Sequence, residues 1–161
     1  TRPAPLKPGH KLDDFECGRP EMDLWLVRHA NRAMQQETAR TFVVCRGGNR
    51  VIGYFSLAAG AVERAGAPGA LSRNSPDPIP AIILARLAVA ESEQGSGLGR
   101  TLLAEAMKRA LQAARIVGAR ALIVHALDEA AATYYEAFGF RRFRTGSDTL
   151  FLPMKDIANN L

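Results

Sequence analysis

The sequence lacks several features that define common protein classes. It has only two cysteines, Cys17 and Cys45, and they form no CxxC pair, so a disulfide scaffold is excluded. Both thiols are expected to be reduced, as in a cytoplasmic protein. The three histidines show no spacing, among themselves or with the cysteines, that is typical of metal ligands, so no metal site is expected.

Long apolar runs are missing as well. The longest, such as residues 80–84 and 121–124, are far too short to cross a bilayer. The opening residues lack the basic-then-apolar pattern of a signal peptide. We therefore expect neither membrane insertion nor secretion.

What the chain has is a globular composition with a basic balance. Of its 161 residues, 47% are hydrophobic and 23% are charged, which suits one globular domain over residues 1–161. The formal net charge is +5 and the pI is about 9.7. A basic surface attracts polyanions, and both a cofactor pyrophosphate and a nucleic acid are polyanions, so charge does not choose between them.

The spacing of apolar residues predicts a mixed α/β order. Residues 1–8 contain three prolines and are expected to form an arm or an edge strand. The other expected elements are helices at 21–36, 98–117 and 128–138, strands at 41–45, 51–57, 81–90, 121–126 and 149–152, and a proline-rich loop at 65–80. The first two of these strands would form a hairpin. This order predicts an α/β fold with a mixed parallel and antiparallel sheet flanked by helices.

One arginine interrupts the strand expected at 81–90. The strand is otherwise a continuous apolar run, which is typical of a central strand buried on both faces. An unpaired charge there would be costly, so Arg86 must reach solvent or a partner. That partner could be an anion in an active-site cleft or a carboxylate in a structural salt bridge.

A glycine-rich turn joins this strand to the helix expected at 98–117. Residues 94–99 read QGSGLG, and free backbone N–H groups at a helix N-terminus, together with the helix dipole, can cradle a pyrophosphate. Glycines leave room for the phosphates and allow positive φ angles. The spacing fits neither GxGxxG nor a Walker A loop. A plain flexible turn remains the alternative.

Two motifs in this chain resemble those of one enzyme superfamily. Gln94-x-x-Gly97-x-Gly99 is similar to the acetyl-CoA loop of GNAT (Gcn5-related) N-acetyltransferases, and residues 134–140 (YYEAFGF) resemble that family's aromatic signature. The expected order of helices and strands is also the family's. Asp128 departs from the pattern, since the family often has Asn there, and no role is assigned to it.

A narrower resemblance is carried by short segments spread over the chain. They are similar to the TacT-like acetyltransferase toxins of toxin–antitoxin pairs, which acetylate the amino group of the amino acid on a charged tRNA and so stop translation. The segments are 15–18 (FECG), 22–26 (MDLWL), 39–43 (ARTFV), 78–80 (PIP), 86–89 (RLAV) and 118–121 (GARA).

The resemblance implies how acetyl-CoA would bind. Backbone groups of one strand would hold the pantetheine arm, and the N–H of Val89 could polarise the thioester carbonyl. The glycine turn and the first helical turn would hold the pyrophosphate, with Arg100 adding charge or facing solvent. The implied contacts are Leu87, Ala88, Val89, Gln94, Gly95, Ser96, Gly97, Leu98, Gly99, Arg100 and Thr101.

The resemblance also implies a catalytic acid. Tyr135 matches the family's position for the group that protonates the leaving thiolate, with a buried structural tyrosine as the alternative. Tyr134 is interpreted as core, because adjacent helical residues point about 100° apart. No base stands out, and an α-amino group with a pKa of about 7.7–8.0 needs little help. His125 is expected to be a hydrogen-bonded core residue rather than one that orients substrate.

Arg73 and Arg86 are the candidate substrate-binding residues, through contacts with RNA phosphate. For Arg73 the alternative is an exposed loop charge. The implied partners are an aminoacyl-tRNA and a ribbon-helix-helix (DUF1778-like) antitoxin, and the assembly could be a homodimer. Two other functions stay open: a GNAT enzyme that acetylates a small amine or a protein N-terminus, and a non-catalytic nucleotide- or RNA-binding module.

Overall fold

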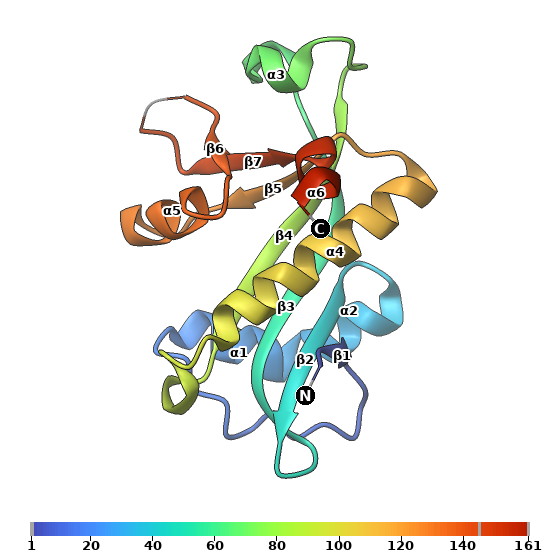
Figure 1. The fold of residues 1–161 in the computed structure, drawn as a ribbon. Helices are drawn as coiled ribbons and strands as arrows, with labels where there is room; N and C mark the ends of the chain where they lie inside the picture. Colours follow the sequence, from blue (N-terminus) through green and yellow to red (C-terminus); the bar gives the residue numbers. More distant parts are fainter. Residues whose placement is uncertain (1, 145, 161) are drawn as a thin grey trace. The chain divides into compact units, whose positions relative to one another are not determined.

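Seven strands pair in the order β1-β2-β3-β4-β5-β7-β6 in the computed structural model, which describes residues 2–144 and 146–160 (Figure 1). The sheet mixes parallel and antiparallel pairs and is accompanied by helices, so the predicted α/β class is confirmed. The chain's contacts divide it into two compact units. The first comprises residues 1–58 and 85–106, and the second comprises residues 59–84 and 107–161.

The first unit contains the predicted hairpin. The edge strand β1 (Ala4–Pro5) pairs antiparallel with β2 (Arg40–Arg46). Strand β2 in turn pairs antiparallel with β3 (Arg50–Val62), which continues into the second unit. Consecutive residues are buried in both strands, and Tyr54 and Phe55 of β3 are fully buried. Figure 1 shows α2 beside this hairpin.

One predicted helix is two helices in the structure. Helix α1 spans Pro20–Arg28 and α2 spans Ala30–Gln36, whereas the apolar spacing predicted a continuous helix at 21–36. The break is at His29, whose φ of −124° and ψ of −23° lie outside the helical region. Leu26 and Ala30, on either side of the break, are both fully buried, so both helices contribute to the core.

Strand β4 (Ile79–Val89) crosses from one unit to the other, and its two halves differ. In the second unit its residues Ala81 to Leu84 pair with β5 (Ala121–His125) in parallel. Beyond Leu84 this pairing ends among the described residues, and Ala85 is exposed while Arg86 is half-buried. The prediction that the whole strand is buried on both faces is therefore wrong for its second half.

The second unit has further antiparallel strands. Strand β5 pairs antiparallel with β7 (Thr149–Pro153), and β7 pairs with the short β6 (Arg141–Arg142). Its helices are α3 (Gly69–Ser72), α5 (Glu129–Glu136), α6 (Met154–Asn160) and the second half of α4 (Leu98–Val117). The sequence predicted neither α3, α6 nor β6. The core cluster consists of Leu71, Ile79, Ala81, Ala121, Ile123 and Phe151.

Candidate functional site

The glycine turn has the backbone conformation that its sequence predicts. After β4 the chain forms a short 3-10 helix at Glu91–Glu93 and turns through Gly95 and Gly97, whose φ angles are 82° and 88°. A Cβ on either glycine would meet no other atom within 4 Å. The glycines are thus required by the backbone, because other residues rarely adopt positive φ, and the space beside them is open.

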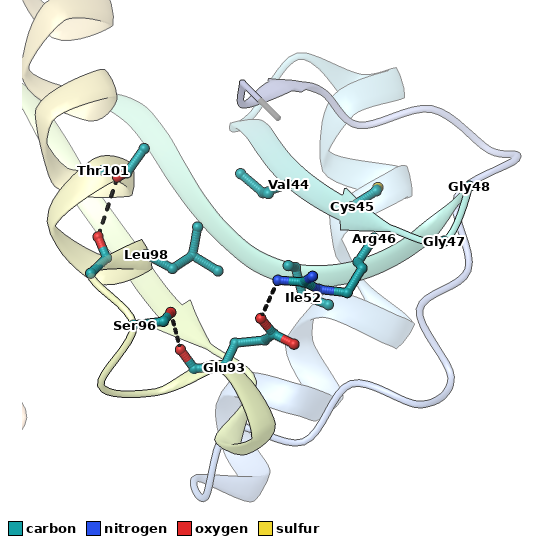
Figure 2. A pocket seen from close by; sticks show the side chains of 11 residues that line it. Val44, Cys45, Arg46, Gly47, Gly48, Ile52, Glu93, Ser96, Leu98 and Thr101 are labelled. Atoms are coloured by element: carbon teal, nitrogen blue, oxygen red, sulfur yellow. Dashed lines mark hydrogen bonds and ion pairs between the residues drawn. The ribbon is translucent and has the colours of Figure 1, made fainter.

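A cavity of about 620 Å³ opens beside this turn in the first unit (Figure 2). It lies between the end of the β2–β3 hairpin and the start of α4, where backbone N–H groups of the first helical turn have no intrahelical acceptor. Its lining consists of Val44, Cys45, Arg46, Gly47, Gly48, Ile52, Glu93, Ser96, Gly97, Leu98 and Thr101. Four predicted cofactor contacts, at positions 96, 97, 98 and 101, therefore line one cavity.

Side chains of the turn brace it against neighbouring main chain. The amide nitrogen of Gln94 donates to the carbonyl oxygens of Cys17 (3.0 Å) and Val89 (2.9 Å). The hydroxyl of Ser96 donates to the carbonyl of Glu93 (2.5 Å), and that of Thr101 to the carbonyl of Gly97 (3.2 Å). These bonds hold the turn in shape and leave its glycines open.

The remaining predicted cofactor contacts lie on either side of the turn. Leu87 and Val89 are half-buried and Ala88 is buried, all in the part of β4 beyond its pairing with β5. At the start of α4, Gly99 is half-buried and Arg100 is exposed. One strand end and one helix start, both in the first unit, thus carry the predicted contacts, whose roles stay predictions.

An ion pair in the cavity was missed by sequence reasoning. Arg46, at the end of β2, approaches the carboxylate of Glu93 to 2.7 Å (Figure 2). The Glu93 side chain is only 13% exposed, so its negative charge would oppose an anionic ligand if it were left unpaired. Arg46 offsets that charge. No motif signals the pair, because its members lie 47 residues apart.

Arg86 lies against an aromatic stack. Its guanidinium carbon is 4.1 Å from the ring centroid of Trp25, a cation–π distance. Trp25 is in turn stacked on Tyr54, with an interplanar angle of 10°. Burial lowers the pKa of Arg86. No carboxylate among the described residues forms an ion pair with Arg86, so the structural salt bridge considered from the sequence is not formed there.

Tyr135 is held in the second unit by helix α5. Asp128 caps this helix by accepting from the N–H of Ala131 (2.8 Å). The Tyr135 residue is 8% exposed, and its ring packs edge-on against Phe140 at 5.4 Å between centroids. Its hydroxyl has no hydrogen-bond partner among the described residues. Burial raises the pKa of Tyr135, so the phenol is protonated at neutral pH.

Two neighbouring predictions are wrong. Tyr134 is 37% exposed rather than core, because Ala132 and Tyr135 occupy the buried face of α5 and Tyr134 points away from it. His125 is exposed at the end of β5 rather than in the core. Its hydrogen bond is present, since Nδ1 lies 3.0 Å from the hydroxyl oxygen of Thr149.

Arg73 follows α3 in the second unit and is exposed. Its carbonyl accepts from a guanidinium nitrogen of Arg120 (3.2 Å). Exposure suits both of its predicted roles, a contact with RNA phosphate and a solvated loop charge.

Within residues 2–144 and 146–160, no group of three or more His, Cys, Asp and Glu side chains is arranged to hold a metal ion. Over the same ranges, no helix combines the length and apolar character needed to cross a membrane.

Comparison with known proteins gives consistent matches. Residues 37–142 match the model of the acetyltransferase (GNAT) domain family. The chain is 44% identical over 156 residues to a tRNA-acetylating toxin of Mycobacterium tuberculosis (strain ATCC 25618 / H37Rv), which covers 97% of this chain and 93% of the relative.

Solved structures agree with the sequence matches. AtaT complexed with acetyl-methionyl-tRNAfMet is 33% identical, with a TM-score of 0.90 over 98% of this chain and 97% of that one. A mutant AtaT toxin bound to the C-terminus of the antitoxin AtaR and acetyl-CoA is 32% identical, with a TM-score of 0.84 over 99% and 96%. The resemblance inferred from two short motifs is confirmed, and the chain belongs to the GNAT acetyltransferase family.

Proposed function

We propose that this chain transfers an acetyl group from acetyl-CoA to the α-amino group of an aminoacyl-tRNA, which would block translation. The observation that carries the proposal is the 44% identity, over nearly the whole of both chains, with a tRNA-acetylating toxin. The likeness to AtaT in complex with acetyl-methionyl-tRNAfMet supports the same substrate class. The family match at 37–142 runs through both compact units, and we propose that they form one acetyltransferase domain over residues 1–161.

The first unit supplies the cofactor contacts in this proposal. The open N–H groups around Gly95 and Gly97 and the start of α4 bind the pyrophosphate. The backbone of Leu87, Ala88 and Val89 holds the pantetheine arm, and the N–H of Val89 polarises the thioester carbonyl. The cavity beside the turn and the positive φ angles of its glycines support this assignment.

The chemistry is direct transfer. The neutral α-amine attacks the acetyl carbonyl carbon and forms a tetrahedral intermediate, which loses the amine's proton to solvent. Collapse breaks the carbon–sulfur bond, and the CoA sulfur takes up a proton from Tyr135, which solvent then restores. The position of Tyr135 in the family's aromatic signature supports this role, and a phenol is protonated at neutral pH and has a proton to donate.

Arg86 and Arg73 bind tRNA phosphate in this proposal. Arg86 has the stronger support, because it is a half-buried cation whose partner is an aromatic ring rather than a carboxylate. Such a guanidinium is positioned by stacking while its N–H donors stay available for phosphate. Arg73 is supported by its exposure alone.

The proposed function also implies which partners the chain has. We propose that a ribbon-helix-helix (DUF1778-like) antitoxin neutralises the chain, that the chain forms a homodimer, and that it works in the cytoplasm, where charged tRNA is found. The structure of an AtaT mutant with the C-terminus of AtaR supports an antitoxin partner. Co-expression of the antitoxin should restore growth and yield a co-purifying complex.

The substrate can be tested directly. Radiolabelled acetyl-CoA and total charged tRNA are incubated with the purified chain, and label is expected in the tRNA fraction. Deacylation of the tRNA beforehand is expected to remove that signal. Labelling of polyamines or peptide N-termini, with charged tRNA left unmodified, would favour the broader GNAT alternative. Binding without any transfer would favour the non-catalytic module.

A further inference from the structure

Arg142 joins the two ends of helix α5. From β6 it makes a bidentate pair with Glu129, the first residue of the helix, at 2.6 and 3.1 Å. The same guanidinium bonds Glu136, the last residue of the helix, at 3.1 Å. A third contact, at 3.4 Å, goes to the carbonyl of Ser147. One side chain therefore ties both ends of α5 to the strand.

The geometry separates this cluster from an ordinary surface ion pair. The Arg142 side chain is only 15% exposed, although Glu129 is 77% and Glu136 43% exposed. Isolated exposed pairs contribute little to stability, but bidentate and networked ones are the exceptions. The pairing lowers the pKa of Glu129 and raises that of Arg142 through the shared hydrogen bonds. Arg142 is itself anchored, because β6 pairs with β7 opposite Leu150.

The cluster acts on the segment that carries Tyr135. Glu136 directly follows Tyr135, and the chain between them and Arg142 includes Phe140, whose ring packs against that of Tyr135. The N–H of Phe140 also donates to the carbonyl of Tyr135 (3.3 Å). Because Glu129 and Glu136 lie seven residues apart, they share one face of the helix. Holding both restrains the helix against sliding and rotation.

We propose that Arg142 is a positioning residue that fixes Tyr135 by holding both ends of α5. This inference rests on the proposed role of Tyr135 as the acid that protonates the leaving thiolate. In this proposal Arg142 contacts neither the substrate nor the reacting atoms. Its contribution is to keep the phenol in place, and displacement of a catalytic group by about 1 Å can cost roughly 10²-fold in rate.

The test uses purified full-length variants and the charged-tRNA acetylation assay. Arg142→Gln is expected to lower kcat by roughly 10- to 100-fold, with the KM for acetyl-CoA unchanged. Arg142→Lys keeps the charge but not the bidentate geometry, so it should restore part of the rate. Glu136→Gln removes one arm and covers the case in which Arg142→Gln does not fold. Arg141→Gln is the matched control, because Arg141 is the neighbouring arginine and pairs with Asp156 instead.

A double-mutant cycle separates positioning from general stability. If Arg142 acts through Tyr135, then Arg142→Gln should cost little further rate in the Tyr135→Phe background. Hydrogen exchange of the α5 amides should be faster in Arg142→Gln and unchanged in Arg141→Gln. An equal loss in both backgrounds, or unchanged exchange, would overturn the inference while leaving the proposed acid intact. A wild-type rate for Tyr135→Phe alone would instead overturn the role of Tyr135.

Discussion

The two units carry different kinds of candidate site. In the first, most of the predicted cofactor contacts are main-chain groups around Gly95 and Gly97, beside an open cavity. In the second, the predicted catalyst is one buried phenol, that of Tyr135, held by ring packing on α5. A main-chain site fails when bulk or the wrong φ angle is introduced, whereas a side-chain site fails when one functional group is lost. The first kind of damage should appear in binding and the second in turnover.

The largest expected effect is the loss of acetyl-CoA binding in Gly97→Trp. The φ of 88° disfavours any side chain, and the indole would fill space that the pyrophosphate needs. Calorimetry should detect no binding, while the far-UV circular dichroism spectrum stays that of the folded protein.

The matched control for this variant is Gly118→Trp. Gly118, at the other end of α4, has a similar φ of 83° and equally open surroundings. It shares the strain of Gly97 without its place in the turn, so acetyl-CoA affinity should be retained. Unchanged affinity in Gly97→Trp itself would exclude the glycine turn as the cofactor site.

Tyr135→Phe should reverse the pattern, with affinity kept and turnover lost. Removing one general acid costs roughly 10²- to 10⁴-fold in kcat, while the ring packing against Phe140 is preserved. Single-turnover acetylation of charged tRNA measures the loss, and calorimetry measures acetyl-CoA binding. Tyr134→Phe removes the same group from the exposed neighbour and should be mild. Equal rates for the two variants would mean that the thiolate leaves without help from Tyr135.

A smaller effect is expected for the tRNA contacts. Arg86→Gln should weaken labelling of charged tRNA and make it less sensitive to salt, by a slope of about 0.7 for one phosphate contact on a single strand. Arg73→Ala tests the other predicted tRNA contact, in the second unit, by the same measurement of labelling against salt. Arg40→Gln removes the same charge from an exposed ion pair and should leave the slope unchanged. An unchanged slope in Arg86→Gln would confine this arginine to its stacking on Trp25.

These regions also differ in how far the sequence could predict them. The glycine turn and the start of α4 at Leu98 were predicted because glycine spacing and apolar periodicity are local signals. The break at His29 was missed because the apolar spacing runs through it without a Gly or Pro to mark it. The exposure of Tyr134 was missed because the phase of the buried face of α5 depends on its packing partners.

Long-range polar contacts were the least predictable part of the candidate site. The Arg46–Glu93 pair and the Arg142 cluster join segments whose proximity only the folded chain establishes. Residues 141–144 read RRFR, and such a basic run by itself indicates only a solvated turn. The structure gives Arg142 two carboxylate partners, so charge counting alone could not have separated it from Arg141.

The smallest expected effect concerns Gln94 and distinguishes two roles. The family resemblance assigns this residue to the cofactor, while the structure shows its amide bonding the carbonyls of Cys17 and Val89. Without these two bonds the turn must be ordered when acetyl-CoA binds. At about 1 kcal/mol net for each bond, the fall in acetyl-CoA affinity in Gln94→Ala has an upper limit of roughly 30-fold. Ser96→Ala removes only one bond from the same turn and should cost less. If Gln94 is a brace, hydrogen exchange at residues 95–99 should be faster in Gln94→Ala before any ligand is added. Unchanged exchange in the free protein, together with weaker binding, would make Gln94 a direct ligand.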